Sequence, residues 1–339
     1  MAKIGLALGG GAARGWAHIG VIKALKAAGI EPDVIAGTSI GAVVGGCHVA
    51  GKLPEIETFA RSMTPRRVFG YFDFNLAGSG LINGQRLSDA LAEQLGDTRM
   101  EDLDRPFTAV ATEIGTGHEV WLSRGRMVEA IRASYAIPGI FKPVKLKDRW
   151  LFDGALVNPI PVSVCRALGA RYVIAVNLNA DLFTLGTVLT DVEAMTEAAP
   201  EIETLKAEAG KKRGALQVVQ RQFFGLAGRA DASVPSLSTI MVDAFNIVHD
   251  RIARSRLAGD PPDILINPKL RNFGLFDFHR ADELIRVGEQ AALRALAELR
   301  EDAHALESGR PADQGTQAVD QTIAAEGAEV LRSASREPR

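Results

Sequence analysis

The chain of 339 residues is 47% hydrophobic and 24% charged, so it can bury a large core and suits one large α/β domain or two small ones. Its formal net charge of -2 gives no reason to expect nucleic acid as a partner, because a protein that binds nucleic acid usually carries a dominant basic surface. Only two cysteines occur, Cys47 and Cys165, so we expect no disulfide framework, no cysteine-rich metal site and a cytoplasmic protein.

Strand and helix patterns alternate along the chain, as in a mostly parallel sheet that is covered by helices. The apolar run at residues 4–8 is too short for a signal peptide or a membrane span, and it predicts the first strand. The other predicted strands are residues 34–36, 107–111, 119–122, 150–152, 172–176 and 263–266. The predicted helices are residues 16–25, 40–50, 54–63, 85–95, 127–134, 236–257 and 281–306.

Two stretches depart from this alternation. Residues 181–235 are rich in alanine and charge, and we expect a peripheral helical insertion or lid there. Residues 307–339 contain almost no large apolar side chains, so they cannot bury enough surface to become ordered and predict a disordered tail. One domain over residues 1–306 is therefore expected.

Residues 34–42 predict a buried strand, a tight glycine turn and a helix start. The turn has the spacing G-x-S-x-G, in which Gly37 and Gly41 flank Ser39 and leave room for a strained backbone at the serine. The hydroxyl of such a serine lies at the N-terminus of the next helix, where negative charge is favoured. The spacing alone leaves open whether Ser39 is a nucleophile or only a turn residue, because the chain contains 34 glycines.

A glycine-rich segment, residues 8–15, lies between the first predicted strand and the first helix, and its successive N–H groups suit an anion. The dinucleotide spacing G-x-G-x-x-G fails, because it needs glycine at Arg14 or at Ala12, and Ser39 stands where the acidic residue is expected. The segment is alternatively an oxyanion hole beside Ser39, at the carboxyl edge of two neighbouring parallel strands. A glycine turn needed only for packing is the third interpretation.

A serine nucleophile needs a base. The histidines after Asp153 are His249, His279 and His304, and their positions within, before or near the end of helices indicate surface or structural roles. Asp153 differs from them, because it directly follows the apolar run at residues 150–152 and precedes two small residues. A carboxylate in this position either caps the next turn or acts as a base that faces a cleft.

Together these segments resemble the patatin-like phospholipase family, in the bacterial subgroup related to neuropathy target esterase. Residues 9–15 resemble the family pattern G-G-G-x-R-G, with one extra alanine in this chain. Residues 37–41 match the pattern G-T-S-x-G, and residues 153–155 match D-G-[GA]. Further similarity lies at residues 131–144, 158–162, 262–266 and 277–281. The resemblance covers about residues 3–178 strongly and residues 236–290 moderately.

The resemblance implies a three-layer α/β/α fold with a mostly parallel central sheet, and a Ser-Asp dyad in which Ser39 is the nucleophile and Asp153 the base. The residues that it assigns to the oxyanion hole are Gly9, Gly10, Gly11 and Arg14. It implies no cofactor, and carboxylic ester hydrolysis of phospholipids or lysophospholipids through an acyl-enzyme. Tyr135 departs from the family pattern, and residues 181–235 match no part of it. A nucleotide-binding or regulatory protein that holds phosphate in the glycine loop is the alternative function.

Two further segments bear on membrane contact. Lys211, Lys212 and Arg213 precede an apolar stretch, which is typical of a basic amphipathic segment on an anionic surface. The aromatic residues 69–74 follow Arg66 and Arg67 and are candidates for an acyl entrance. Peripheral contact with the inner face of the membrane is the hypothesis here; a lid helix, an oligomer contact and ordinary core are the alternatives.

Overall fold

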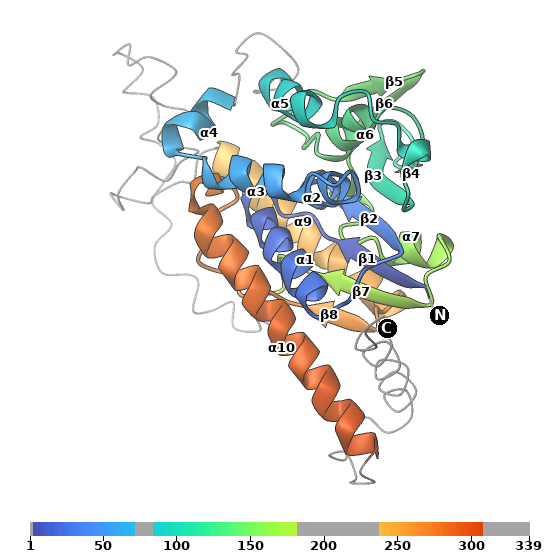
Figure 1. Cartoon of the computed structure of the whole chain (residues 1–339). Helices are drawn as coiled ribbons and strands as arrows, with labels where there is room; N and C mark the ends of the chain where they lie inside the picture. The colour runs from blue at the N-terminus through green and yellow to red at the C-terminus, as the bar shows by residue number, and fades with distance from the viewer. Residues whose placement is uncertain (1–2, 72–83, 182–236, 308–339) are drawn as a thin grey trace, which may run out of the picture.

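The computed structural model describes residues 3–71, 84–181 and 237–307 (Figure 1). Its centre is a mixed, mostly parallel sheet of eight strands. The strands are β1 (Ile4–Leu8), β2 (Val34–Thr38), β3 (Phe107–Glu113), β4 (Glu119–Leu122), β5 (Val144–Leu146), β6 (Arg149–Asp153), β7 (Tyr172–Val176) and β8 (Ile264–Ile266). The α-helices are α1 (Ala17–Ala27), α2 (Ile40–Val49), α3 (Leu53–Arg61), α4 (Pro65–Tyr71), α5 (Gln85–Leu95), α6 (Met127–Ser134), α7 (Val162–Ala167), α9 (Leu237–Gly259) and α10 (Ala281–Glu307).

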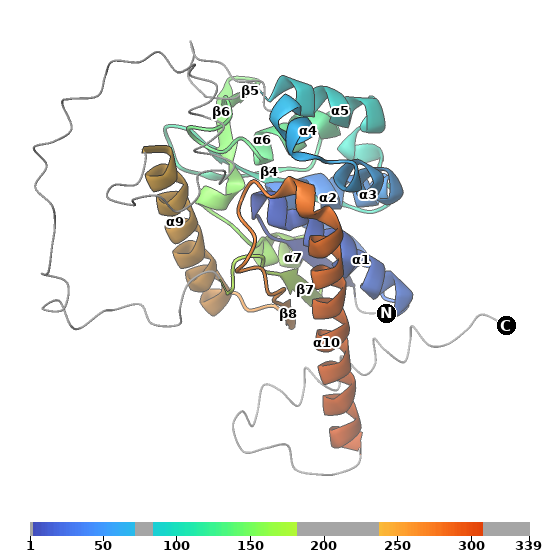
Figure 2. The ribbon, with the colours of Figure 1, turned by 90° about the vertical axis from the view of Figure 1, so that its left-hand side faces the viewer.

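Helices cover both faces of the sheet, which confirms the predicted three-layer α/β/α fold. Alternate residues of a strand point to opposite faces. Leu6 and Leu8 accordingly pack in one core with α1, α2 and α10, whereas Ala7 packs in a second core with α7 and Ala253 of α9. Figures 1 and 2 show α1 and α10 on one side of the sheet and α9 on the other.

Two strands meet end to end on the same edge of β3. β2 and β4 both pair with Val110, so they lie on opposite edges of β3. β4 and β6 both pair with Ala111, so these two strands also lie on opposite edges. β2 and β6 therefore share one edge, where Thr38 ends β2 opposite Val110 and Asp153 ends β6 opposite Ala111. Ser39, which follows β2, and Asp153 at the end of β6 are thereby brought together, although more than a hundred residues separate them in the chain.

Helices α1 and α10 pack with their backbones in close contact. A Cβ atom on Gly20 would lie 1.9 Å from the carbonyl oxygen of Ile285, and a Cβ on Gly288 would lie 1.9 Å from that of Ala17. Any larger side chain at either glycine would force the helices apart, because both obstacles are backbone atoms. The sequence therefore fixes α10 against the helix that follows the glycine loop.

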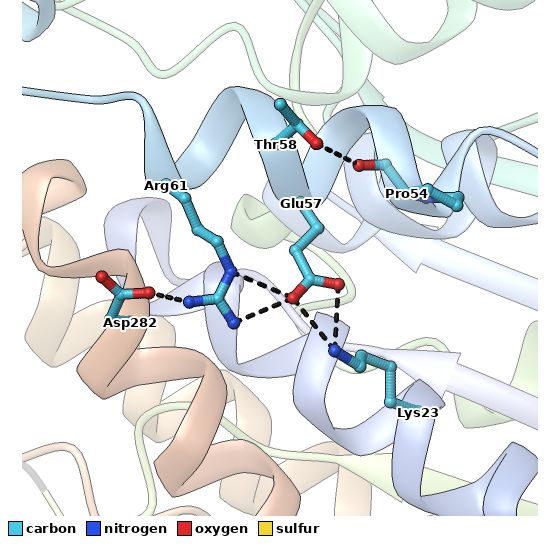
Figure 3. A network of polar contacts seen from close by, with 6 residues as sticks. All are labelled: Lys23, Pro54, Glu57, Thr58, Arg61 and Asp282. Carbon is cyan, nitrogen blue, oxygen red and sulfur yellow. Dashed lines mark hydrogen bonds and ion pairs between the residues drawn. The ribbon is translucent and has the colours of Figure 1, made fainter.

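A polar network also joins α3 to α1 and α10 (Figure 3). The carboxylate of Glu57 accepts hydrogen bonds from Lys23 Nζ at 3.0 Å and from Arg61 Nη2 at 2.9 Å, and Arg61 pairs with Asp282 as well. Burial raises the pKa of Glu57, but the hydrogen bonds from Lys23 and Arg61 together outweigh burial and the pKa is lowered. The ionised form is thus favoured, and the network holds α3 in place.

The predicted strands and helices are confirmed, with shifts of a few residues at their ends. The three-residue strand β5 and the short helices α4 and α7 are additions, since none of them is long enough to show a period in the sequence. Lys211, Lys212 and Arg213 lie outside the described residues, as do residues 72–74, nearly all of the expected insertion and the tail from residue 308. The domain boundaries stay predictions.

Candidate active site

Ser39 stands in the sharp turn between β2 and α2. Its backbone φ of 57° and ψ of -124° form a combination that residues other than glycine rarely adopt. Its two flanking glycines are required by space. A Cβ on Gly37 would lie 2.5 Å from the carbonyl carbon of Gly41, and a Cβ on Gly41 would lie 2.1 Å from the carbonyl oxygen of Leu8. The turn is held by Ser134 Oγ, which accepts from the N–H of Ser39 at 2.9 Å.

Ser39 and Asp153 are in direct contact. The hydroxyl of Ser39 donates to Asp153 Oδ2 at 2.6 Å, and the other carboxylate oxygen accepts from the N–H of Ala155 at 2.8 Å. The serine is 4% exposed and the aspartate is fully buried. Asp153 thus both caps the next turn and contacts the serine, so the two interpretations of this residue are compatible.

The carboxyl group of Asp153 has an altered acidity. Burial raises its pKa from 3.8 to about 7, against the opposing hydrogen bonds from Ser39 and Ala155. A base with a pKa near neutrality can accept a proton and release it again during one reaction cycle. The pair is chemically equipped to deprotonate the serine hydroxyl without a histidine.

Two N–H groups of the glycine loop after β1 donate to backbone carbonyls of other segments of the protein. The N–H of Gly9 donates to Val176 O at 3.1 Å, and the N–H of Gly10 donates to Pro159 O at 3.0 Å. Within the described part of the chain, the N–H of Gly11 has no acceptor. Of the three glycines assigned to an oxyanion hole, Gly11 therefore offers the available donor.

Arg14 ties the loop to two distant segments of the chain. Its Nε donates to Phe273 O at 2.9 Å and its Nη1 to Asn179 Oδ1 at 3.0 Å. Burial lowers the pKa of the guanidinium to about 10, partly offset by Asp181 and Asp277, so it stays charged at neutral pH. The neighbouring N–H of Ala13 donates to Leu275 O at 3.0 Å, so residues 273–275 hold the loop from outside.

His249 of α9 lies beside the glycine loop, which the sequence interpretation of this residue did not anticipate. It is 4% exposed, and its Nδ1 lies 2.8 Å from Asn179 Nδ2. Its Nε2 lies 3.3 Å from the point where a Cβ on Gly10 would stand. A histidine on the inner face of a predicted helix was the available signal, but its neighbours come from distant segments.

An apolar cavity opens at Ser39. It lies among α2, α3, α4 and α5, which gather at one end of the sheet in Figures 1 and 2. Its walls are almost wholly aliphatic and aromatic. Examples are Val43, Ile56, Phe59, Leu91 and Tyr135. Tyr135, the departure from the family pattern, is therefore a wall residue of this cavity.

The described part of the chain contains no group of three or more His, Cys, Asp or Glu side chains arranged to hold a metal ion. Nor is any helix among residues 3–71, 84–181 and 237–307 long and apolar enough to cross a membrane.

Residues 6–166 match the family model of patatin-like phospholipases. An uncharacterized NTE family protein of Mycobacterium tuberculosis is 34% identical over 328 residues, which cover 87% of this chain and 91% of the relative. The chain belongs to the patatin-like phospholipase family. Its membership implies a lipid hydrolase.

Two further similarities are to a longer relative and to a solved structure. The lysophospholipase NTE1 of Yarrowia lipolytica is 29% identical to this patatin-like chain over 306 residues, which cover 88% of the chain but 20% of that relative. Among solved structures, VipD from Legionella pneumophila aligns with 99% of this chain and 81% of its own, at a TM-score of 0.33 and 11% identity. The second likeness is too low to support an inference.

Proposed function

We propose that this chain is a serine-aspartate acyl hydrolase that cleaves carboxylic esters of phospholipids or lysophospholipids. The observation that carries the proposal is the hydrogen bond of 2.6 Å from Ser39 to Asp153 at the end of an apolar cavity. The cavity offers a long acyl chain an apolar environment, and the ester carbonyl of such a chain is placed at the serine. The family assignment is consistent with this chemistry.

In the proposed reaction Asp153 takes the proton of the Ser39 hydroxyl as Oγ attacks the carbonyl carbon of the ester. The tetrahedral intermediate collapses as the bond to the alcohol oxygen breaks, and Asp153 returns the proton to that oxygen. The acyl group is then bonded to Ser39 Oγ. A water molecule, deprotonated by Asp153, attacks this ester, and the fatty acid leaves as Oγ recovers its proton. Serine and aspartate return to their initial states.

For the negative oxygen of the intermediate we propose the N–H of Gly11 as a donor. The carbonyl of Gly10 accepts from Asn179 Nδ2 at 3.2 Å. This carbonyl and the N–H of Gly11 belong to one trans peptide, so the N–H points away from Asn179. One such donor contributes roughly 3 kcal/mol to transition-state stabilisation. In this proposal Arg14 acts by bracing the loop, because its donors are engaged elsewhere.

The same contacts weaken the alternative of a phosphate-binding protein. A phosphate cradle needs several N–H groups that converge on one point. The N–H groups of Gly9 and Gly10 already donate to backbone carbonyls, and Arg14 is held in the interior. We therefore favour the hydrolase.

Labelling with a fluorophosphonate probe, together with turnover of a soluble acyl ester, tests the function. Ser39→Ala is expected to abolish labelling, and Ser39→Ala and Asp153→Asn are each expected to lower kcat at least about 10⁴-fold, since dyad members act as a unit. Ser123→Ala, which changes an exposed serine, is the matched control and keeps both signals. Unchanged labelling and turnover in Ser39→Ala would refute the proposal.

We also propose that the cavity mouth meets an anionic lipid surface. Arg66, Arg67 and Arg86 line a shallow hollow together with Tyr71, and Tyr71 also lines the apolar cavity. The contacts of Arg67 Nη1 and Arg86 Nη1 are to backbone carbonyls, which do not neutralise charge. Basic side chains around an apolar opening suit a peripheral enzyme that takes lipid from a membrane.

Vesicle co-sedimentation tests this contact. The wild type should bind vesicles that contain anionic lipid more strongly than neutral ones, and Arg66→Glu/Arg67→Glu should lose most of that difference. Arg124→Glu/Arg251→Glu makes the same change of charge at exposed positions elsewhere and is the control. Equal binding by the two double variants would contradict a role for this hollow.

A further inference from the structure

A second, smaller pocket also opens at Ser39. It has only Ala12, Ser39 and Ile137 in common with the apolar cavity, so the two spaces diverge from the nucleophile. The walls that belong to the small pocket alone include the polar residues Asn179, Asn246 and His249. An ester bound at Ser39 has two arms, the acyl chain and the alcohol. An apolar and a partly polar space beside one serine match these two arms.

The side-chain amide of Asn179 has a fixed orientation in this pocket. Its oxygen accepts from Arg14 Nη1 at 3.0 Å, and a guanidinium can only donate. Its nitrogen donates to the carbonyl of Gly10 at 3.2 Å, and a carbonyl can only accept. Because Arg14 can only donate and the Gly10 carbonyl can only accept, the opposite orientation of the amide would break both hydrogen bonds. The nitrogen of Asn179 is therefore the atom that faces His249.

This orientation determines the tautomer of His249. The amide nitrogen of Asn179 lies 2.8 Å from Nδ1 of the imidazole and donates to it, so Nδ1 is an acceptor. Burial, aided by the charge of Arg14, lowers the pKa of His249 to about 4, and the ring is neutral at physiological pH. A neutral imidazole with an accepting Nδ1 carries its proton on Nε2.

The Nε2–H group of His249 is a buried donor with no acceptor among the described residues. The imidazole is held on two sides, by Asn179 and by Phe245, whose ring stacks on it at 6.0 Å with an interplanar angle of 16°. A buried donor without a partner is unfavourable, so a ligand atom that completes this hydrogen bond would be favoured here.

The donor and the nucleophile flank the same point. A Cβ atom placed on Gly10 would lie 3.3 Å from His249 Nε2 and 3.4 Å from Ser39 Cβ. Because Gly10 carries no side chain, nothing on this residue separates the donor from the nucleophile, and one bound substrate can contact both. Arg14 acts on His249 through its charge, but its Nε and Nη1 donate to Phe273 and Asn179, so the donor that His249 offers here is a neutral one. Such a donor suits a hydroxyl or ester oxygen better than a phosphate.

We propose that the small pocket receives the alcohol part of the substrate and that His249 Nε2–H donates a hydrogen bond to an uncharged oxygen of that alcohol. His249 is thereby a specificity residue for oxygen-bearing leaving groups, such as a glycerol unit with a free hydroxyl. The inference rests on the proposed ester hydrolysis. It adds a substrate contact to the Ser39 and Asp153 chemistry without changing it.

Two esters with the same acyl chain test the contact, 1-octanoylglycerol and p-nitrophenyl octanoate. His249→Asn keeps an oxygen near the position of Nδ1 to accept from Asn179, but lacks any group at Nε2. It is expected to lower kcat/KM for the glycerol ester roughly 10- to 100-fold and that for the nitrophenyl ester less than about threefold. His249→Gln places an amide nitrogen near Nε2 and should recover part of the loss on the glycerol ester.

Equal losses on both esters would overturn the proposal, since His249 would then act only by holding the loop. The absence of any loss on the glycerol ester would overturn it as well. If the wild type hydrolyses neither ester and fluorophosphonate does not label Ser39, both the proposed function and this contact are refuted. If the wild type is labelled and active, the proposed function stands and the variants test the His249 contact alone.

A measurement on the wild type does not depend on the folding of variants. In protein labelled with ¹⁵N-histidine, the resonances of His249 at pH 7 should show the proton on Nε2, and 1-O-octylglycerol, a non-hydrolysable analogue, should shift Nε2 more than Nδ1. A proton on Nδ1, or an unchanged Nε2 in the presence of saturating analogue, contradicts the assignment.

Discussion

The pH dependence of turnover tests the assignment of Asp153 as the base. Its carboxyl is fully buried, and burial raises the pKa from 3.8 to about 7 although Ser39 and Ala155 donate hydrogen bonds to it. The rise corresponds to roughly 4 kcal/mol of extra cost for the ionised form. Because only the ionised form can take the serine proton, activity must increase with pH through this pKa.

The assay is kcat/KM for a soluble octanoyl ester between pH 5 and 9. Below pH 7 the value should rise roughly tenfold for each pH unit, and above pH 8 it should be level, because the profile reports the base of the free enzyme. A profile that is already flat from pH 5 would show an ionised carboxylate at acidic pH. It would refute the argument from burial.

The same carboxyl should affect the stability of the fold. Between about pH 4 and pH 7 the folded protein holds a proton on Asp153 that the unfolded chain has lost, so the free energy of unfolding falls as pH rises. From pH 5 to pH 8 this contribution amounts to roughly 3 kcal/mol. Asp153→Asn removes the titration, so urea unfolding of this variant should lose less stability over the same range. An identical loss in both proteins would contradict the raised pKa.

Three other perturbations follow from the packing. Gly41→Ala sets a Cβ 2.1 Å from Leu8 O and should lower the free energy of unfolding by roughly 3 kcal/mol or more. Gly259→Ala, where the space is open, is the control and should lower it by less than about 1 kcal/mol. Equal effects in thermal unfolding would contradict the need for glycine in the turn at Ser39. Val43→Phe narrows the apolar cavity and should lower kcat/KM for long-chain esters about tenfold relative to short-chain ones; an unchanged ratio would remove this cavity as the acyl site. Glu57→Gln weakens the network on α3 and should lower Tm by about 2 to 4 °C, an effect that 1 M salt reduces.

Ser39 and Asp153, which the structure brings into contact, could be selected from the sequence because their signals are local. Ser39 follows the apolar strand β2 and lies between Gly37 and Gly41, and Asp153 ends the apolar strand β6 and precedes Gly154 and Ala155, which a single sequence displays. The resemblance to a family then related the two segments. The physical reason for their contact could not be predicted, because it lies in the register of β2 and β6 on β3, and strand pairing between distant segments leaves no local pattern.

The details of the loop required the structure for the same reason. Gly9, Gly10 and Gly11 are equivalent in sequence, and the partners that distinguish them, Val176 and Pro159, lie more than a hundred residues away. His249 shows the same limit. Helical periodicity can place it on a buried face, but its tautomer depends on Asn179, which belongs to a different segment of the chain.

The bracing of the glycine loop has a consequence for the order of assembly. Arg14 is held by the carbonyl of Phe273, 259 positions later in the chain, and Ala13 is held by Leu275. During synthesis the N-terminal strand and its loop emerge first, but their support is made near the end. Under the proposed mechanism, a ribosome-bound chain displays its serine long before the loop with the oxyanion donor is supported, and hydrolysis should begin only after translation has passed these residues.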